Sequence, residues 1–100
     1  MSTRKLYTVL LATCLLCMTA ASSNAADMSP FERGIDRPGS DASGLTLPRN
    51  DAGLCRDQCA VSRPCVAWSF VPANRGCFLK NSAPVPTLNA GVISGVKTIQ

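Results

Sequence analysis

The sequence feature that most constrains this chain is the set of four cysteines at positions 55, 59, 65 and 77. A chain of 100 residues buries only a small core, so covalent cross-links matter for its stability. Cys55 and Cys59 are one helical turn apart, which places both side chains on one side of a helix. Residues 65–71 are β-branched and aromatic and predict a strand, residues 72–76 have turn composition, and residues 77–80 predict the returning strand. The segment is therefore predicted to be a helix followed by a β-hairpin.

The register of this hairpin decides which side chains face the helix. A loop of residues 72–76 would place Val71 opposite Cys77 and Phe70 opposite Phe78. Side chains alternate between the two faces of a sheet. One face would then carry Cys65, Ala67, Ser69, Val71, Cys77 and Leu79, and we expect the helix to pack on it. The other face would carry Val66, Trp68, Phe70, Phe78 and Lys80, with Trp68 opposite Lys80.

Four cysteines allow three disulfide pairings. A bond between Cys55 and Cys59, inside one helical turn, has poor geometry. Loop entropy does not distinguish the two remaining pairings. The short connection from helix to strand keeps Cys59 near Cys65, whereas Cys55 lies one turn earlier, toward the hairpin loop and Cys77. We therefore favour Cys59–Cys65 nested inside Cys55–Cys77.

The pattern C-x3-C-x5-C-x-A-W-x-[FY]-V, followed after a loop by C-[FW]-L-K, resembles the PAN/apple domain family. The form it resembles is the compact one common in bacterial secreted proteins, and the flanks at 34–41 and 94–97 are similar too. The resemblance implies an α+β fold, in which a small antiparallel β-sheet is wrapped around one α-helix and stapled by nested disulfides. Relatives often carry extra cysteines near the C-terminal strand. Residues 89–93 contain none, so no third disulfide is expected.

Residues 1–25 have the layout of a secretory signal peptide. Arg4 and Lys5 are followed by an apolar run over residues 6–21 and by the small residues that favour cleavage at 23–25. The apolar run is short for a membrane-spanning helix. Cys14 and Cys17 would be removed with this segment.

The remaining chain predicts one small domain, in which export allows the disulfides to persist. We expect a flexible N-terminal tail over residues 26–32 and the PAN/apple-like domain over residues 33–100. Within it, residues 45–47 predict a brief strand and Asn50 a helix N-cap. Residues 81–91 predict a surface loop and residues 92–99 a final strand, in which Gly95 marks a bulge or a close approach.

Composition argues against catalysis. The chain has no histidine, which is the most common general base and metal ligand. The cysteines lack the spacing of zinc sites, and export would oxidise them. Of ten basic residues, Arg4 and Lys5 lie in the signal peptide, so eight basic and six acidic residues give the remainder a charge of about +2. That charge is too small to indicate nucleic acid or a membrane surface. We expect no enzyme activity, no metal and no cofactor.

The resemblance implies a non-catalytic binding module for proteins or carbohydrates. Arg75 in the hairpin loop and Arg63 after the helix are candidate polar contacts. Trp68 beside Lys80 is a candidate binding platform if the terminal strands leave its edge exposed. We expect a secreted or periplasmic protein that binds an extracellular or periplasmic protein or glycan and keeps no stable membrane anchor after cleavage. The alternative is a small secreted inhibitor or a structural accessory protein of the envelope.

Overall fold

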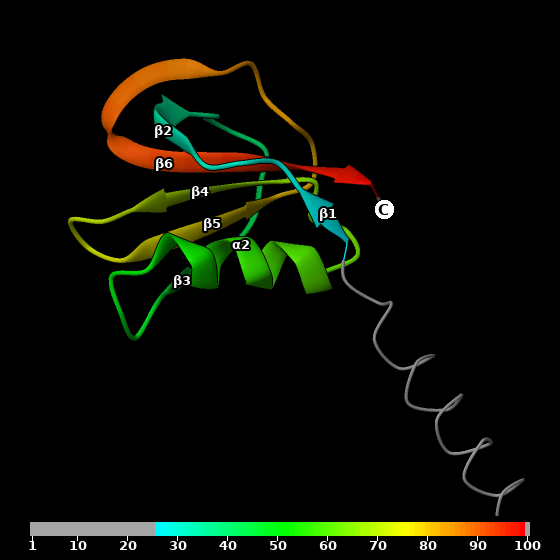
Figure 1. The fold of residues 1–100 in the computed structure, drawn as a ribbon, viewed down its shortest axis with the longest axis horizontal. Helices are drawn as coiled ribbons and strands as arrows, with labels where there is room; N and C mark the ends of the chain where they lie inside the picture. The colour runs from blue at the N-terminus through cyan, green and yellow to red at the C-terminus, as the bar shows by residue number, and fades with distance from the viewer. Residues whose placement is uncertain (1–25, 100) are drawn as a thin grey trace, which may run out of the picture.

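The computed structural model describes residues 26–99, so the predicted signal peptide lies outside the described residues. The elements are β1 (Asp27–Met28), β2 (Glu32–Asp36), β3 (Asp41–Thr46), α2 (Ala52–Val61), β4 (Ala67–Val71), β5 (Gly76–Lys80) and β6 (Thr87–Ile99). The six strands form one sheet in the order β1-β6-β4-β5-β3, and β2 also pairs with β6. All of these pairings are antiparallel, and α2 lies against one face of the sheet (Figure 1). This arrangement confirms the predicted α+β, PAN/apple-like fold class.

Helix α2 begins after Asp51, which acts as its N-cap. The Asp51 carboxylate accepts a hydrogen bond from the backbone nitrogen of Gly53 at 2.9 Å, and this satisfies one of the unpaired donors of the first turn. The cap is therefore one residue later than the predicted Asn50. The buried residues of the helix, Ala52, Cys55 and Cys59, turn toward the sheet.

Two disulfides join the helix to the rest of the chain. One links Cys55 to Cys77 on β5, with 5.5 Å between their Cα atoms. The other links Cys59 to Cys65, just before β4, with 5.2 Å between their Cα atoms. All four cysteines are buried. This is the nested pairing that the sequence favours, and it fixes both ends of α2 on the hairpin.

The β4–β5 hairpin differs by one residue from the predicted register. Val71 lies opposite Gly76 and Phe70 opposite Cys77, so the loop has four residues and not five. The reason is local: Arg75 adopts a left-handed conformation with a φ of 59°, and Gly76 joins the strand with its backbone nitrogen donating to the Asn74 side chain at 2.9 Å. A shift of one residue in one strand changes which side chains share a face.

The face toward α2 therefore carries Trp68 and Phe70 in place of Ala67 and Ser69. Trp68, Phe70, Cys77 and Leu79 share the face on which α2 packs, and all four are buried. Phe31, from the segment before β2, meets the Trp68 ring edge-on at 5.6 Å between centroids. Such edge-to-face pairs are a favoured aromatic geometry. These large side chains give α2 an apolar surface to pack against, although the chain is short.

The face of the sheet turned away from α2 is called the second face below. It carries alternate residues of the hairpin: Ala67, Ser69, Val71, Phe78 and Lys80. Ser69 and Lys80 are buried polar residues, and Ser94 of β6, paired with Ser69, is buried on the same face. The buried polar side chains of the described residues, Ser69, Lys80 and Ser94, thus lie on the second face.

The N-terminal segment belongs to the sheet, where the sequence predicted a flexible tail over 26–32. Asp27 and Met28 of β1 pair with β6, and Glu32 of β2 lies opposite Ser94. Strand β6 also begins earlier than predicted, at Thr87, so its first part lies in the segment expected to be a loop. This first part arches back along β2 above the rest of the sheet (Figure 1).

Candidate functional site

The structure separates the two members of the predicted aromatic platform. Trp68 is 0% exposed and lies under α2, whereas Lys80 is 2% exposed and lies on the second face. The residue opposite Lys80 is Ala67. The prediction that Trp68 presents an edge beside Lys80 is therefore wrong, because the register shift turns the indole inward.

Arg63 and Arg75 are both exposed, and they lie apart. Arg63 precedes β4 and Arg75 follows it, so the two lie toward opposite ends of this five-residue strand. The Arg75 backbone is held in place, since its carbonyl accepts a hydrogen bond from the Leu47 nitrogen at 2.9 Å. The two arginines therefore offer separate candidate contacts.

The second face contains a hollow that the sequence analysis did not find. This polar hollow has a volume of about 230 Å³ and is lined by Asp36, Pro38, Gly39, Asp41, Ser69, Val71, Phe78, Lys80 and Val92. Its residues come from the end of β2, the following turn, and strands β3, β4, β5 and β6. Elements distant in the sequence thus bring two carboxylates, an ammonium group and a hydroxyl to one place, beside four apolar side chains.

Asp36 is held in position at one wall of the polar hollow. Its Oδ1 atom accepts a hydrogen bond from the Ser69 hydroxyl at 2.8 Å and another from the Arg37 backbone nitrogen at 2.7 Å. An ionised carboxylate has about four acceptor positions on its two oxygens. The Oδ2 atom is therefore free to accept further hydrogen bonds from a ligand.

Lys80 forms another wall of the polar hollow. Its ammonium group donates to the carbonyl oxygen of Gly39 at 3.0 Å and to the carboxylate of Asp41. This ion pair and hydrogen bond explain how a lysine can be buried at the sheet surface. An ammonium group has three N–H donors, so these two partners leave one donor unused, on a side chain that is only 3% exposed.

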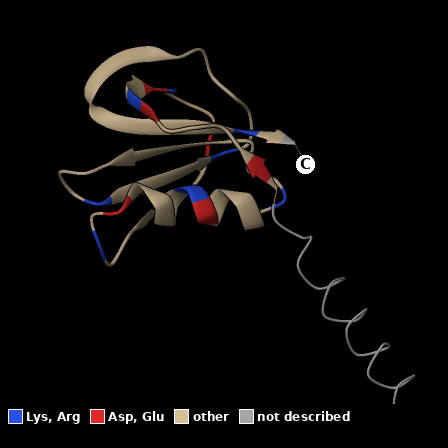
Figure 2. Ribbon diagram, in the orientation of Figure 1, with Lys and Arg blue, Asp and Glu red and all other residues tan. Residues whose placement is uncertain are grey.

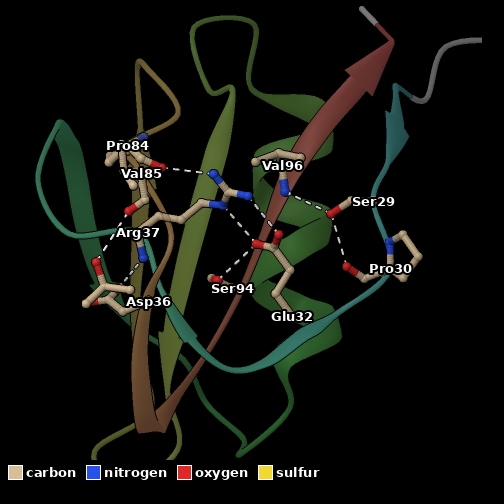
Figure 3. A network of polar contacts seen from close by, with 10 residues as sticks. Ser29, Pro30, Glu32, Asp36, Arg37, Pro84, Val85, Ser94 and Val96 are labelled. Atoms are coloured by element: carbon tan, nitrogen blue, oxygen red, sulfur yellow. Dashed lines mark hydrogen bonds and ion pairs between the residues drawn. The ribbon is translucent and has the colours of Figure 1, made fainter.

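A charged network fixes β2, and with it Asp36. The Arg37 guanidinium donates through Nε and Nη2 to the two carboxylate oxygens of Glu32, both at 2.8 Å, and through Nη1 to the carbonyl oxygen of Pro84 at 2.9 Å (Figure 3). The Ser94 hydroxyl donates to Glu32 at 3.1 Å. Arg37 thus joins β2 to the segment before β6, and Glu32 links this pair to β6 through Ser94.

The same network shifts two pKa values. The hydrogen bond from Arg37 lowers the pKa of Glu32 below its ordinary value of 4.5, and the Ser94 hydrogen bond and the charge of Arg37 act in the same direction. Partial burial opposes this shift. The hydrogen bond to Glu32 in turn raises the pKa of Arg37. Both groups are therefore charged in the folded protein near neutral pH.

The sequence contained a signal for the polar hollow. Ser69 and Lys80 sit in strands of otherwise apolar residues, which is where a polar side chain needs a partner. With the observed register, period-two alternation places both on the second face. The contribution of Asp36 could not be found this way, because its position depends on the pairing of β2 with the far end of the chain.

Basic and acidic residues are both found on several elements of the described part of the molecule (Figure 2). Within residues 26–99, no helix is both long enough and apolar enough to cross a membrane. In the same range, no three histidine, cysteine or acidic side chains come together as a metal site would require. The chemistry that the described site offers is hydrogen bonding and apolar contact.

Comparison with known proteins agrees with this fold. A segment of 36 residues, 36% of this chain, is 44% identical to an uncharacterized protein of Acanthamoeba polyphaga mimivirus. The match covers 10% of the length of that viral protein, so this chain resembles only a small part of it. Residues 35–80 match the family model described as the PAN domain. PAN domains generally bind proteins or carbohydrates, and no enzyme family is indicated. The matched segment holds both disulfides and most of the polar hollow, and it supports placing this domain in the PAN/apple family.

Proposed function

We propose that this protein is an exported, non-catalytic module that binds a carbohydrate in the polar hollow of its second face. The observation that carries the proposal is the convergence of Asp36, Ser69 and Lys80 on one hollow of about 230 Å³. Concave sites with a few fixed polar groups on an apolar wall are typical of small-molecule binding. The volume lies below the range of drug-sized sites, so it suits one sugar ring.

The chemistry of the hollow suits hydroxyl groups. The Asp36 carboxylate accepts hydrogen bonds, Lys80 donates one, and both are oriented by other contacts. A sugar hydroxyl can donate to the first while a neighbouring hydroxyl accepts from the second. The side chains of Val71, Phe78 and Val92 offer a wall for the C–H face of the ring.

The charge of the hollow favours a neutral ligand over an anion. Its wall contains two carboxylates, Asp36 and Asp41, against the single ammonium group of Lys80. Asp41 and Lys80 are already paired, which leaves Asp36 as the uncompensated charge. Binding should therefore weaken only modestly with added salt, in contrast to binding of a polyanion.

Export follows from the predicted signal peptide together with the two disulfides, which persist in oxidising compartments. These two features support a mature domain in the periplasm or the extracellular space, and the proposal includes no stable membrane anchor, metal, cofactor or nucleic-acid partner. A secreted inhibitor or an accessory protein of the envelope would use the same stapled scaffold with a protein as partner.

A protein partner is the second candidate, and the exposed hairpin loop favours it. Arg75 is exposed, its backbone is fixed by Leu47, and the loop is anchored by the Cys55–Cys77 disulfide close by. A rigid loop loses little conformational entropy on binding. Arg63 would belong to a separate contact of such an interface.

The proposal is tested with an array of monosaccharides and short oligosaccharides that includes glucose, galactose and N-acetylglucosamine, and with a pull-down from extracts of the producing organism. Asp36→Asn keeps an oxygen to accept from Ser69 but removes the charge, and it should weaken sugar binding about tenfold, the equivalent of one strong hydrogen bond. Asp57→Asn, on the exposed side of α2, is the matched control and should bind normally.

If Arg75→Ala abolishes a protein interaction while no sugar binds the wild type, the protein-binding alternative replaces the carbohydrate proposal. If sugar binding is retained in Asp36→Asn and lost in Arg75→Ala, the site lies at the hairpin loop. Either result would exclude the polar hollow as the binding site.

A further inference from the structure

A second hollow lies on the same face of the sheet, next to the polar hollow. This edge hollow has a volume of about 360 Å³ and is lined by Gly44, Leu45, Thr46, Asn74, Gly76 and Phe78. It is formed by the edge strand β3, the hairpin loop and the start of β5. Phe78 lines both hollows, so this residue lies between them.

The ring of Phe78 occupies the space that two missing side chains would fill. Gly44 lies directly opposite Phe78 on β3, and a Cβ atom there would lie 3.3 Å from Cδ1 and Cε1 of the ring. A Cβ atom at Gly76, two residues earlier on the same strand, would lie 3.2 Å from Cε2. Glycine at both positions allows the ring to lie along the sheet surface. Phe78 stays partly exposed there.

Polar groups are available on both sides of the ring. In the polar hollow they are Asp36 and Lys80. In the edge hollow, Thr46 offers an exposed hydroxyl, and Asn74 uses its side-chain oxygen for the Gly76 nitrogen at 2.9 Å, which leaves its amide hydrogens as donors. The second face therefore offers hydrogen-bonding groups on both sides of one apolar ring.

We propose that the ligand of the second face is a chain of at least two linked sugar units that crosses the ring of Phe78. One unit occupies the polar hollow and the next occupies the edge hollow, with the partly exposed ring as the apolar floor between them. This inference rests on the proposed carbohydrate function, and it adds the number of units, their path and the residue on which they meet. Strand β3 is the edge strand on this side, and no strand pairs with its outer edge in the described structure, so no strand would block a longer sugar chain there.

The test compares glucose and N-acetylglucosamine with their β-1,4-linked tetramers by isothermal titration calorimetry. We expect a tetramer to bind the wild type at least about tenfold more tightly than its monomer, since a second subsite adds contact area and hydrogen bonds. Phe78→Tyr keeps the ring and should preserve this ratio. Phe78→Ala should bring the ratio close to one.

Thr46→Trp provides a second variant that does not depend on the packing of Phe78. Thr46 is exposed on an edge strand, so a large side chain there should fill the edge hollow and leave the fold intact. We expect it to remove the advantage of the tetramer while monomer binding is unchanged. Equal affinity of the wild type for monomer and tetramer would overturn the two-unit ligand and leave the proposed function standing. Failure of every sugar on the array and in the titrations to bind would overturn both.

Discussion

Trp68 of β4 and Gly95 of β6 lie directly opposite each other, and the indole of Trp68 rests against the backbone of Gly95. A Cβ atom at position 95 would lie 2.7 Å from Nε1 and 2.9 Å from two ring carbons of Trp68. Real Cβ atoms essentially never approach so closely. The close approach predicted at Gly95 is therefore present, and it makes room for the largest side chain of the core.

Gly95→Ala is expected to destabilise the domain by about 1–3 kcal/mol, which is typical of overpacking in a core. Trp68 is 0% exposed and bounded by α2 and Phe31, so the indole cannot move away freely. Urea unfolding followed by tryptophan fluorescence measures the change. Gly91→Ala is the control, because position 91 is exposed and a Cβ atom there would have its nearest heavy atom 3.6 Å away. Equal stability of the two variants would contradict the packing described here.

The two disulfides should contribute unequally. The Cys55–Cys77 bond spans 22 residues, and its removal in a double alanine variant should cost about 3 kcal/mol in the chain-entropy model. The Cys59–Cys65 bond spans 6 residues and should cost about 2 kcal/mol. Thermal unfolding of the two double variants gives the order. A larger loss of stability on removing Cys59–Cys65 would show that the longer disulfide is not the main contributor to stability.

Glu32 should make stability depend on pH in the acid range. Its pKa is lower in the folded protein than the ordinary 4.5, mainly through the Arg37 hydrogen bond, so the unfolded chain binds the proton more readily. The contribution is fully present above about pH 4.5 and is lost as the pH falls through the folded pKa. Glu32→Gln should therefore cost about 1 kcal/mol at pH 7 and little at pH 2.

Urea unfolding of wild type and Glu32→Gln across this pH range tests the claim. Asp57→Asn is the comparison, since Asp57 forms an exposed ion pair with Arg56 and its loss should change the free energy of unfolding by less than about 0.5 kcal/mol. A cost of Glu32→Gln that is the same at pH 7 and pH 2 would mean that the ion pair with Arg37 does not stabilise the fold.

Processing can be checked directly by intact mass on material from the culture medium or periplasm. The protein should begin near Ala26, after loss of the signal peptide, and should contain no free thiols because its four remaining cysteines are paired. A mass that retains Met1, or a lipid attached to Cys14, would contradict export as a soluble mature domain.

The local part of the fold could be predicted from the sequence, because the spacing of the cysteines encodes it. Helix, hairpin and nested disulfides all lie within residues 51–80. The register could not be predicted, since the usual rule assigns positive φ in a turn to glycine. Here Arg75 adopts that conformation with a φ of 59°, and Gly76 enters the strand. That single residue decides whether Trp68 or Ala67 faces the helix.

The pairing of the chain ends was not visible in the sequence. Strand β2 has the composition of a loop, with Gly34 at a φ of 73°, and its partner Ser94 lies far along the chain. Its place is fixed by Arg37, which binds Glu32 and the carbonyl of Pro84. Because Asp36 reaches the polar hollow only through this pairing, the candidate site could not be assembled from local patterns.

Amide chemical-shift mapping shows whether the second face binds a sugar. The ¹⁵N-labelled domain is titrated with the best-binding sugar of the glucose, galactose and N-acetylglucosamine panel. We expect the largest shifts on the amides of Asp36, Ser69, Phe78 and Lys80, and we expect Asp36→Asn to reduce them. Shifts confined to the hairpin loop around Arg75, or no shifts at millimolar sugar, would contradict it.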